Sequence, residues 1–394
     1  MTIDVAALRA DTPGCGEVVH LNNAGASLPP RVVTETVVAH LRREAQTGGY
    51  EAAAEAEERV EAVYRSVAAL LHADPADVAL VDNATRAWQS VAYGLPLAAG
   101  DRILVDRAQY SSSVVDLLRL ADRHGASVEV VQDDEGGQVD VADLRRRLGQ
   151  GSVALVSLTH VPTHGGLVNP AAEVGAATRA AGVPLLLDAC QSAGQIDLDV
   201  EAIGCDALSA TGRKYLRGPR GTGFLWVRPE LRRRLDPPWP DLRGATWTGD
   251  RTFDLRDDAR VFETWERNLA ALLGLGAAVE YARGVGVPAI EERVRDLAGD
   301  LRTMLDALPG VTTHDTGRQR CGIVVFRVAG VDAAEVRDSL RAHGVNTSVT
   351  DAAGSRWALV DRGLPDLVRA SVHAYNTEQD LAALCDALPG ARPA

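Results

Sequence analysis

Short apolar runs alternate with amphipathic stretches through the middle of the chain. Seven runs rich in aliphatic or β-branched residues predict strands: Val78–Val81, Arg102–Val105, Ser127–Val131, Val153–Leu158, Val183–Leu187, Asp206–Ser209 and Gly223–Val227. Helical patterns lie between them, and those at Ser112–His124 and Pro170–Ala181 are each followed by a glycine, the usual residue just after a helix. This alternation predicts a mainly parallel sheet covered by helices.

The flanking regions predict the remaining organisation. Glu51–Leu71 is amphipathic at helical spacing, and the segment DPPWP near residue 240 interrupts the pattern. Further helices are predicted over Asn268–Arg283 and Pro288–Ala307, and a smaller α/β unit over Gly322–Val328, Ala333–His343, Val345–Val349, Arg369–Val372 and Glu378–Leu388. We predict an N-terminal segment (residues 1–20), a large domain (residues 21–262) and a small C-terminal domain (residues 263–394).

Composition narrows the function classes. The 394 residues are 46% hydrophobic and carry 54 acidic against 41 basic side chains, a formal net charge of −13. That charge disfavours binding to nucleic acids or anionic membranes, and neither a long apolar span nor a signal-peptide pattern is visible, so we expect a cytoplasmic protein. Five scattered cysteines without a CxxC pair, and nine histidines without ligand spacing, give a metal site no support.

Lysine usage points to the chemistry. Lys214 is the only lysine among the 41 basic residues. Arginine stays protonated in proteins, whereas lysine can lose its proton and form a Schiff base with an aldehyde. A lone lysine can also survive by chance in an arginine-rich composition, so its surroundings must decide.

Ligands of open parallel sheets bind beyond the carboxyl ends of the strands, and three such ends carry suitable groups. Thr85 follows the first strand at the start of a helix, where it could bind a phosphate or simply cap the helix. Asp188 ends the Leu185–Leu187 run and needs a cation such as a protonated ring nitrogen, although a helix cap or an arginine would also satisfy it. Thr211 and Arg213 precede Lys214 and could bind a phosphate.

A lysine that captures an aldehyde, an aspartate for a pyridinium nitrogen and a phosphate site together describe pyridoxal 5′-phosphate (PLP). The sequence resembles the class V aminotransferase and cysteine desulfurase family of fold-type I PLP enzymes from about residue 21 to 388. The matching stretches are LNNAG (Leu21–Gly25), LLLDACQSAGQIDLD (Leu185–Asp199), SATGRKYLRGPRGTGFLWV (Ser209–Val227) and RASVHAYNTEQDL (Arg369–Leu381). The resemblance implies an α/β fold-type I architecture, with a large, mainly parallel seven-stranded sheet domain and a small C-terminal α/β domain, in a homodimer.

The resemblance also implies roles for individual residues. Lys214 corresponds to the lysine that binds PLP, and Asp188 to the partner of its ring nitrogen. The other residues implied to bind the cofactor are Thr85, Arg86, Tyr110, Thr163, Gln191, Thr211 and Arg213. Those implied to bind an amino-acid substrate are Ala24, Gly25 and Arg369, whose guanidinium suits a carboxylate. Without the family, Tyr110 equally fits a core residue beside a helix, and Arg369 a surface ion pair.

Two departures from the family bear on the reaction. Desulfurases of the family carry a catalytic cysteine shortly before the carboxylate-binding arginine, yet residues 344–368 here contain no cysteine. Trp265 and Glu266 stand where many relatives have a Gly-Thr-Pro-Asn run whose threonine reaches the partner's cofactor phosphate, so that contact is not carried over.

We therefore expect β-elimination from a cysteine S-conjugate or its sulfoxide, releasing pyruvate and ammonia. In its segment EAQTGGYEAAAEAE (Glu44–Glu57) and in its lack of a sulfur-accepting thiol, the sequence resembles the C–S lyases of ergothioneine-type thiol pathways. An aminotransferase or epimerase is the main alternative, because these reactions use nearly the same residues around PLP. A cysteine desulfurase is less favoured. A PLP-binding regulator would need a DNA-binding helix-turn-helix, which the sequence does not show.

Overall fold

Seven strands form the central sheet of the computed structural model, which describes residues 3–351 and 354–388. The sheet order is β2-β8-β7-β6-β5-β3-β4; β8 is antiparallel to β2 and β7, and the remaining pairs are parallel. The strands are β2 (Val78–Val81), β3 (Arg102–Val105), β4 (Ser127–Val130), β5 (Val153–Thr159), β6 (Leu185–Asp188), β7 (Ala207–Thr211) and β8 (Gly223–Val227). The predicted α/β architecture with a mainly parallel seven-stranded sheet is confirmed.

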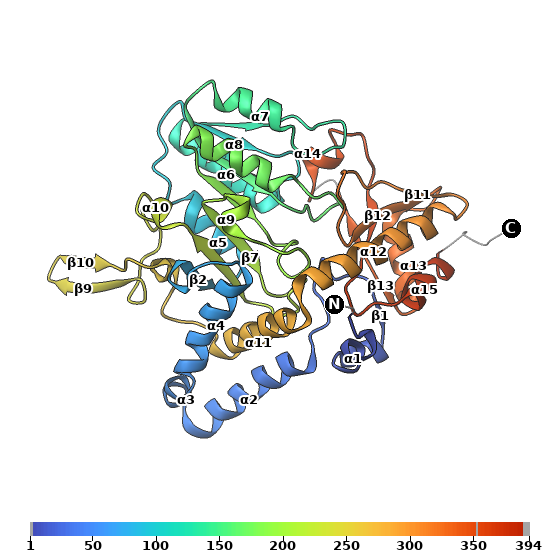
Figure 1. Cartoon of the computed structure of the whole chain (residues 1–394), viewed down its shortest axis with the longest axis horizontal. Coiled ribbons are helices and arrows are strands. Elements are labelled where there is room, and N and C mark those ends of the chain that lie inside the picture. The colour runs from blue at the N-terminus through green and yellow to red at the C-terminus, as the bar shows by residue number, and fades with distance from the viewer. Residues whose placement is uncertain (1–2, 352–353, 389–394) are drawn as a thin grey trace.

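Helices cover both faces of this sheet (Figure 1). Side chains alternate between the faces: Leu186 packs with Trp88 and Leu117, whereas Leu185 and Leu187 belong to the larger core on the other face, which explains the continuous apolar run. The helices of this part are α2 (Arg31–Thr47), α3 (Gly49–Glu55), α4 (Glu57–Leu70), α5 (Ala84–Ala92), α6 (Ser111–His124), α7 (Val141–Leu148), α8 (Ala171–Ala181), α9 (Val200–Ile203), α10 (Pro229–Arg232) and α11 (Leu269–Val285), with 3₁₀ turns η2 (Pro75–Asp77) and η3 (Ala259–Phe262).

Local signals correctly placed the ends of two helices, α6 and α8. Gly125 and Gly182 follow α6 and α8 in the left-handed conformation, with φ of 69° and 67°, as a glycine after a helix is expected to do. The predicted helix at Glu51–Leu71 is instead two helices, α3 and α4, that meet at Ala56.

A second, four-stranded antiparallel sheet lies beside the first part, in the order β11-β12-β15-β14. Its strands are β11 (Val311–Thr313), β12 (Ile323–Val328), β14 (Ser348–Thr350) and β15 (Leu367–Ser371), and its helices are α12 (Val287–Asp306), α13 (Ala333–Ala342), α14 (Arg356–Leu359) and α15 (Glu378–Asp386). The single strand predicted at Val345–Val349 is two strands, because β13 (Val345–Asn346) leaves this sheet to pair with the N-terminal segment.

The N-terminal segment packs against this smaller part. It contains α1 (Val5–Ala10), η1 (Pro13–Gly16) and β1 (Val19–His20), which pairs in parallel with β13. The domain boundary at residue 263 stays a prediction; in the structure α11 packs on α2 and α4, and the chain turns at Gly286 into α12, which packs on β11 and β12. Residues 1–2 and 389–394, which fall in the predicted terminal units, lie outside the described residues.

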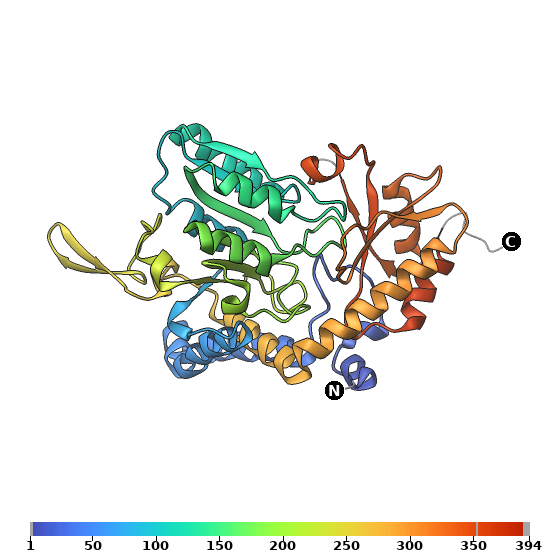
Figure 2. The same ribbon diagram turned by 45° about the horizontal axis from the view of Figure 1, so that its top comes forward.

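The sequence pattern did not predict one prominent element. The hairpin of β9 (Ala245–Gly249) and β10 (Thr252–Leu255) projects away from the large sheet (Figure 2) and leaves Trp247 and Phe253 exposed. Within the described part of the chain, no single helix is long and apolar enough to cross a membrane, and only the bent pair α11–α12, counted together, passes on length and composition.

Candidate active site

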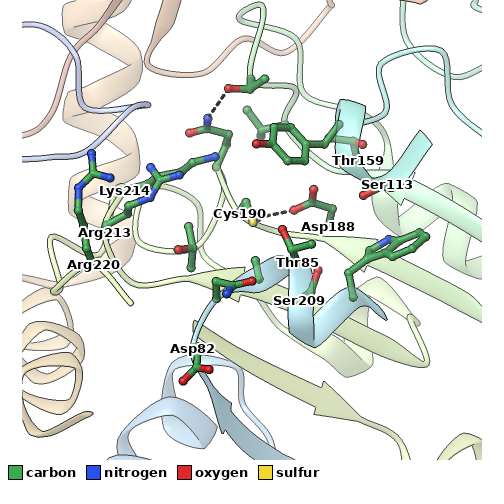
Figure 3. A pocket seen from close by; sticks show the side chains of 18 of the residues that line it. Asp82, Thr85, Ser113, Thr159, Asp188, Cys190, Ser209, Arg213, Lys214 and Arg220 are labelled. Carbon is green, nitrogen blue, oxygen red and sulfur yellow. Dashed lines mark hydrogen bonds between the residues drawn. The ribbon is translucent and has the colours of Figure 1, made fainter. Parts of the chain in front are cut away.

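A cavity of about 160 Å³ opens at the carboxyl ends of the strands in the large sheet (Figure 3). Strands β5, β6 and β7 each contribute residues to its wall, as does the start of α5. Most of the predicted cofactor-binding residues line it, namely Thr85, Tyr110, Thr163, Asp188, Gln191, Thr211, Arg213 and Lys214. The structure therefore brings together residues that are up to about 130 positions apart in the sequence.

Lys214 and Asp188 are held by adjacent strands. Asp188 ends β6 and pairs in register with Ser209 of β7, and Lys214 follows β7 by a short turn. Both side chains are buried. Burial lowers the pKa of the Lys214 ammonium, and the charges of Arg213 and Arg369 act in the same direction, against Asp188. A lowered pKa makes more of the neutral amine available as a nucleophile.

Asp188 has neighbours on its own chain segment. Its Oδ1 accepts a hydrogen bond of 2.8 Å from the backbone N–H of Cys190, and the Cys190 thiol is also hydrogen-bonded to the carboxylate (Figure 3). No lysine or arginine forms an ion pair with Asp188 in the described residues. A buried carboxylate without a cationic partner is costly, so this carboxylate suits a cationic ligand group.

Gln191, Thr163 and Arg369 form a hydrogen-bonded chain that leads away from Asp188. Gln191 Nε2 donates to Thr163 Oγ1 over 3.0 Å, and Arg369 Nη1 donates to the same oxygen and to the Thr163 carbonyl, each over 2.8 Å. Arg369 comes from β15 of the smaller sheet, so this chain joins the two parts of the molecule. Burial lowers the pKa of Arg369 to about 10, and nearby Arg213 contributes.

The predicted substrate residues Ala24 and Gly25 lie against this chain rather than in the cavity wall. The Ala24 carbonyl accepts from Gln191 Nε2 over 3.0 Å, and the Gly25 carbonyl accepts from Arg213. A side chain at Gly25 would meet Asn22 Oδ1 at 2.7 Å, and that oxygen accepts from Arg369 Nη2 over 3.3 Å. A side chain at Gly25 would therefore displace the Asn22 carboxamide that contacts the Arg369 guanidinium.

The phosphate end that the sequence predicted is built around the start of α5. Asn83 caps the helix by accepting from the Arg86 N–H over 2.9 Å, which leaves the first N–H groups of the helix for another acceptor. Thr85 lies in this first turn, and the Thr211 hydroxyl donates to the Thr222 carbonyl over 3.3 Å. Arg86 does not join the cavity wall, because its guanidinium lies 4.0 Å above the ring of Trp239.

Several buried polar atoms around the cavity have no hydrogen-bond partner within the described residues. In the described residues, Gln191 Oε1, Ser209 Oγ, Thr159 Oγ1 and Arg369 Nε are buried without a hydrogen-bond partner. Such groups are rare and costly unless a ligand or water satisfies them. The Asp188 carboxylate fits the ring nitrogen of PLP, the buried Lys214 amine fits its aldehyde, and the N–H groups at the start of α5 fit its phosphate. The Arg369 guanidinium fits the carboxylate of an amino acid. The residues present therefore fit PLP.

Some residues of the site were not found from the sequence. Ser209 and Thr159 line the cavity but have no signal beyond their positions at strand ends, and Arg220 is inconspicuous among 40 arginines. Asp106 is buried and accepts from the backbone N–H of Thr159 over 2.8 Å, an interaction that fixes the loop carrying Tyr110 to β5. Asp106 follows β3, so the strand-end rule that found Asp188 could also have found it.

The described part of the segment without cysteine contacts the loop after β3. Asp361 forms an ion pair of 2.8 Å with Arg107, which follows β3. Of the residues that line the cavity, Cys190 is the only cysteine. Burial and the adjacent Asp188 carboxylate raise the pKa of its thiol well above the ordinary value, so the thiol stays protonated and is a poor nucleophile.

Known proteins share this architecture. The family profile described as "Aminotransferase class-V" matches residues 18–384. A probable cysteine desulfurase of Xylella fastidiosa is 32% identical over 376 residues, covering 92% of this chain and 88% of the relative. The apo structure of a cysteine desulfurase from Thermococcus onnurineus superposes with a TM-score of 0.90 at 25% identity, covering 97% of this chain and 96% of that one.

A second solved neighbour carries a different activity in its name. The cystine C–S lyase C-DES, in complex with its product cysteine persulfide, superposes with a TM-score of 0.85 at 23% identity, covering 95% of this chain and 98% of that one. A mutant of the same lyase was solved with glycine covalently linked to the PLP cofactor. With the cavity described above, these matches show that the chain belongs to the class V aminotransferase family and that its cofactor is pyridoxal 5′-phosphate.

Proposed function

We propose that this PLP enzyme is a C–S β-lyase that cleaves a cysteine S-conjugate or its sulfoxide to pyruvate, ammonia and a sulfur product. The observation that carries the proposal is that the candidate site has no thiol suited to accept sulfur. Residues 344–368 contain no cysteine, and Cys190, in the cavity, is protonated and hydrogen-bonded to Asp188. A desulfurase needs a thiolate to accept sulfur, whereas β-elimination needs none.

Each group of the site has a task in such an elimination. Bound PLP withdraws electrons from Cα of an amino acid, which acidifies its proton and allows a substituent on Cβ to leave. Lys214 Nζ takes the Cα proton as general base, and its lowered pKa favours the neutral amine that this task needs. Asp188 balances the positive charge of a ring nitrogen, and Arg369 with Thr163 holds the α-carboxylate.

The bond changes balance without a second protein nucleophile. The Cα–H bond breaks with its proton going to Lys214, and the Cβ–S bond breaks with both electrons leaving on sulfur. Hydrolysis of the remaining three-carbon unit gives pyruvate and ammonia. A sulfoxide sulfur leaves more readily than a thioether because the departing anion is more stable.

The relatives support C–S chemistry in general and leave the reaction open. The names of the curated relatives are those of cysteine desulfurases, and that of a structural neighbour is that of a cystine C–S lyase. The aminotransferase and epimerase alternatives differ only in where the Cα proton is returned. We therefore choose an experiment that separates the products.

The test is to incubate the holoenzyme with cysteine, S-alkyl cysteines, their sulfoxides and ordinary amino acids, and to measure pyruvate, ammonia, sulfide, keto acids and stereochemical inversion. We expect pyruvate and ammonia in equal amounts from the S-substituted cysteines, fastest from the sulfoxides. A keto acid that retains the whole substrate skeleton, with accumulation of pyridoxamine phosphate, would show an aminotransferase. Inversion without elimination would show an epimerase, and persulfide on a cysteine would show a desulfurase.

We also propose that the enzyme is a homodimer. The segment from residue 239 to 265 exposes Trp247, Phe253 and Trp265 by 72%, 59% and 61%, in a chain with only 4% aromatic residues. Exposed aromatic side chains are enriched at protein interfaces. Light scattering should give twice the mass of 41.7 kDa, and Trp247→Ser with Phe253→Ser should shift the equilibrium towards the monomer. A parent protein that is monomeric at micromolar concentration would contradict the proposal.

A further inference from the structure

The turn that carries Lys214 ends on a residue in a rare backbone conformation. Arg217 has φ of +63°, in the left-handed region that residues with a side chain seldom adopt. Its backbone N–H donates over 2.9 Å to the Lys214 carbonyl and closes the turn. A conformation of this kind persists only where the surrounding contacts determine it. The contacts of Arg217 therefore bear on the position of Lys214.

The Arg217 side chain is a buried cation whose partners are neutral. Its Nε donates to the Leu28 carbonyl over 2.9 Å, and its Nη2 donates to the Thr12 hydroxyl. The guanidinium carbon lies over two tyrosine rings, 4.7 Å from the centre of Tyr375 and 5.4 Å from that of Tyr281. No carboxylate forms an ion pair with Arg217 in the part of the chain that the structure describes. Because a buried cation is costly without compensation, these rings and oxygens fix the side chain in one place.

The other side of the turn packs on the same segment after β15. The Tyr215 ring stacks on His373 with centroids 5.7 Å apart, and His373 stacks on Tyr375 at 5.1 Å. Burial lowers the pKa of His373 to about 3, so its ring is neutral. Its Nδ1 accepts from the Ala374 N–H over 2.8 Å, so its Nε2 carries the hydrogen and donates to the Tyr215 carbonyl over 3.0 Å. We call Tyr215, His373, Tyr375 and Arg217 the stacked column.

The stacked column connects Lys214 with the strand that carries Arg369. Tyr375 lies four residues beyond the end of β15. Its hydroxyl donates to Asn23 Oδ1 over 2.5 Å, and Asn23 Nδ2 donates to the Ser371 carbonyl of β15 over 2.7 Å. The turn with Lys214 and the end of the strand with Arg369 are therefore packed together as one unit.

We propose that Arg217 is a positioning residue, which holds Lys214 in its buried place at the cofactor and in line with Arg369. The guanidinium completes the stacked column and keeps the turn closed. The inference concerns the amine that captures the cofactor aldehyde, so it is independent of the reaction that follows.

Opening of the turn has a measurable electrostatic consequence. Burial is the largest cause of the lowered pKa of the Lys214 ammonium. The titratable or charged groups that also act on it are Cys190, Asp188, Arg213 and Arg369. A substitution at Arg217 changes none of these groups, and it gives water more access to the amine. More access raises the Lys214 pKa towards its ordinary value.

The experiment follows the capture of PLP by the full-length apoenzyme with stopped-flow absorbance at a series of pH values. We expect Arg217→Gln to move the rise in capture rate upward by about 0.5 pH unit or more, and to slow capture at neutral pH roughly 10-fold. The backbone N–H groups of residues 214–218 should also exchange with deuterated water faster than in the parent, in apoenzyme and holoenzyme alike.

Two further substitutions at the same position separate the charge from the backbone conformation. Arg217→Lys keeps the charge without the planar group that stacks on the tyrosine rings, and its capture should lie between that of the parent and that of Arg217→Gln. Arg217→Gly accepts the positive φ without strain but has no guanidinium, and it should behave like Arg217→Gln.

Arg260→Gln is the matched control. The Arg260 guanidinium also lies over a tyrosine ring, 4.0 Å from the centre of Tyr64, but its ion pair is with Glu61. This variant should lower the melting temperature and leave both the pH profile of capture and the exchange of residues 214–218 as in the parent.

Tyr281 provides a second route that leaves the turn itself unchanged. Tyr281→Phe removes the hydroxyl, which donates to Asp11, and keeps the ring beneath Arg217, so it should resemble the parent. Tyr281→Leu removes the ring and should shift the pH profile in the same direction as Arg217→Gln, by a smaller amount.

An Arg217→Gln variant with a lower melting temperature, but with the pH profile and the exchange of the parent, would overturn the proposal, because Arg217 would then serve stability alone. Capture by Arg217→Gly at the rate of the parent would also contradict it, since the backbone conformation and not the guanidinium would then position Lys214. If Arg217→Gln does not accumulate as folded protein, Tyr281→Leu decides by the same two measurements, and a profile identical to that of the parent would again contradict the proposal.

Discussion

The candidate site has two ends that are constructed differently, one proposed to hold the cofactor and the other proposed to hold the substrate carboxylate. The cofactor end places Asp188 at the end of β6 and Lys214 in the turn after β7, neighbouring strands of one buried sheet that pair in register at Asp188 and Ser209. The substrate end joins Arg369 of the smaller sheet to Thr163, in the loop after β5, and to Asn22, which follows β1. The first end depends on the folding of one domain, and the second on how three segments dock. We therefore expect changes at the cofactor end to act on the chemical step and changes at the substrate end to act on affinity and selectivity.

The largest effect should come from Lys214→Ala. Removing the amine removes both the covalent attachment of PLP and the general base, and we expect turnover to fall by a factor of roughly 10³ or more. Borohydride reduction followed by mass spectrometry should find the pyridoxyl group on Lys214 of the parent. A pyridoxyl group on another residue, or its absence from the reduced parent, would contradict the cofactor end as described.

A smaller loss is expected from Asp188→Asn, which keeps the size of the side chain and removes its charge. The amide cannot balance a protonated ring nitrogen, so turnover should fall by roughly 10²-fold with little change in the concentration needed for half-saturation. Steady-state kinetics with one S-substituted cysteine checks this. Equal turnover in the variant and the parent would show that Asp188 serves only its hydrogen bonds with Cys190.

The substrate end should respond in the opposite way. Arg369→Ala breaks a buried charge pair with the α-carboxylate, an expected loss of about 2–5 kcal/mol in kcat/KM, and most of it should appear as a higher KM. Thr163→Val, which removes the hydroxyl shared by Gln191 and Arg369, is the milder variant of the same test. Retained preference of Arg369→Ala for amino acids over the corresponding amines would show that the carboxylate binds elsewhere.

The residues around Asp188 and Lys214 are easier to predict from the sequence than those around Arg369, and the construction of the two ends explains why. Short apolar runs and strand-end residues are local signals, so β2–β8, Asp188 and Lys214 could be located from the pattern alone. The hydrogen bond from Arg369 to Asn22 joins residues 347 positions apart. Contacts of this kind produce no pattern in the nearby sequence. Only the family motif suggested that Arg369 belongs to the site, and Arg86 shows the limit of transferring a motif neighbour, because its side chain packs on Trp239.

The hairpin β9–β10 shows a related limit. Its residues are exposed on both faces, so the burial that produces an alternating pattern in a sheet is absent from this pair of strands.

The pH dependence of cofactor capture should reveal the electrostatics shared by the two ends. Only the neutral amine of Lys214 attacks the aldehyde, so the rate of holoenzyme formation should rise with pH as the ammonium loses its proton. Because burial and the charges of Arg213 and Arg369 lower this pKa, the rise should come below the ordinary 10.5. Arg369→Gln should move the rise to higher pH. A rise near 10.5 in the parent, measured by stopped-flow absorbance, would contradict this environment.

The smallest expected effect concerns Cys190, the thiol nearest to the cofactor end. Its protonated thiol is hydrogen-bonded to Asp188, so Cys190→Ser retains a donor to the same carboxylate and should keep pyruvate release within about 2-fold of the parent. Cys190→Ala removes that donor and should cost a few-fold more. Serine at each of the other four cysteines should also leave activity unchanged, because β-elimination transfers no sulfur to the protein. Loss of activity in one cysteine variant, together with a persulfide on that residue in the parent, would identify a desulfurase whose thiol lies outside residues 344–368.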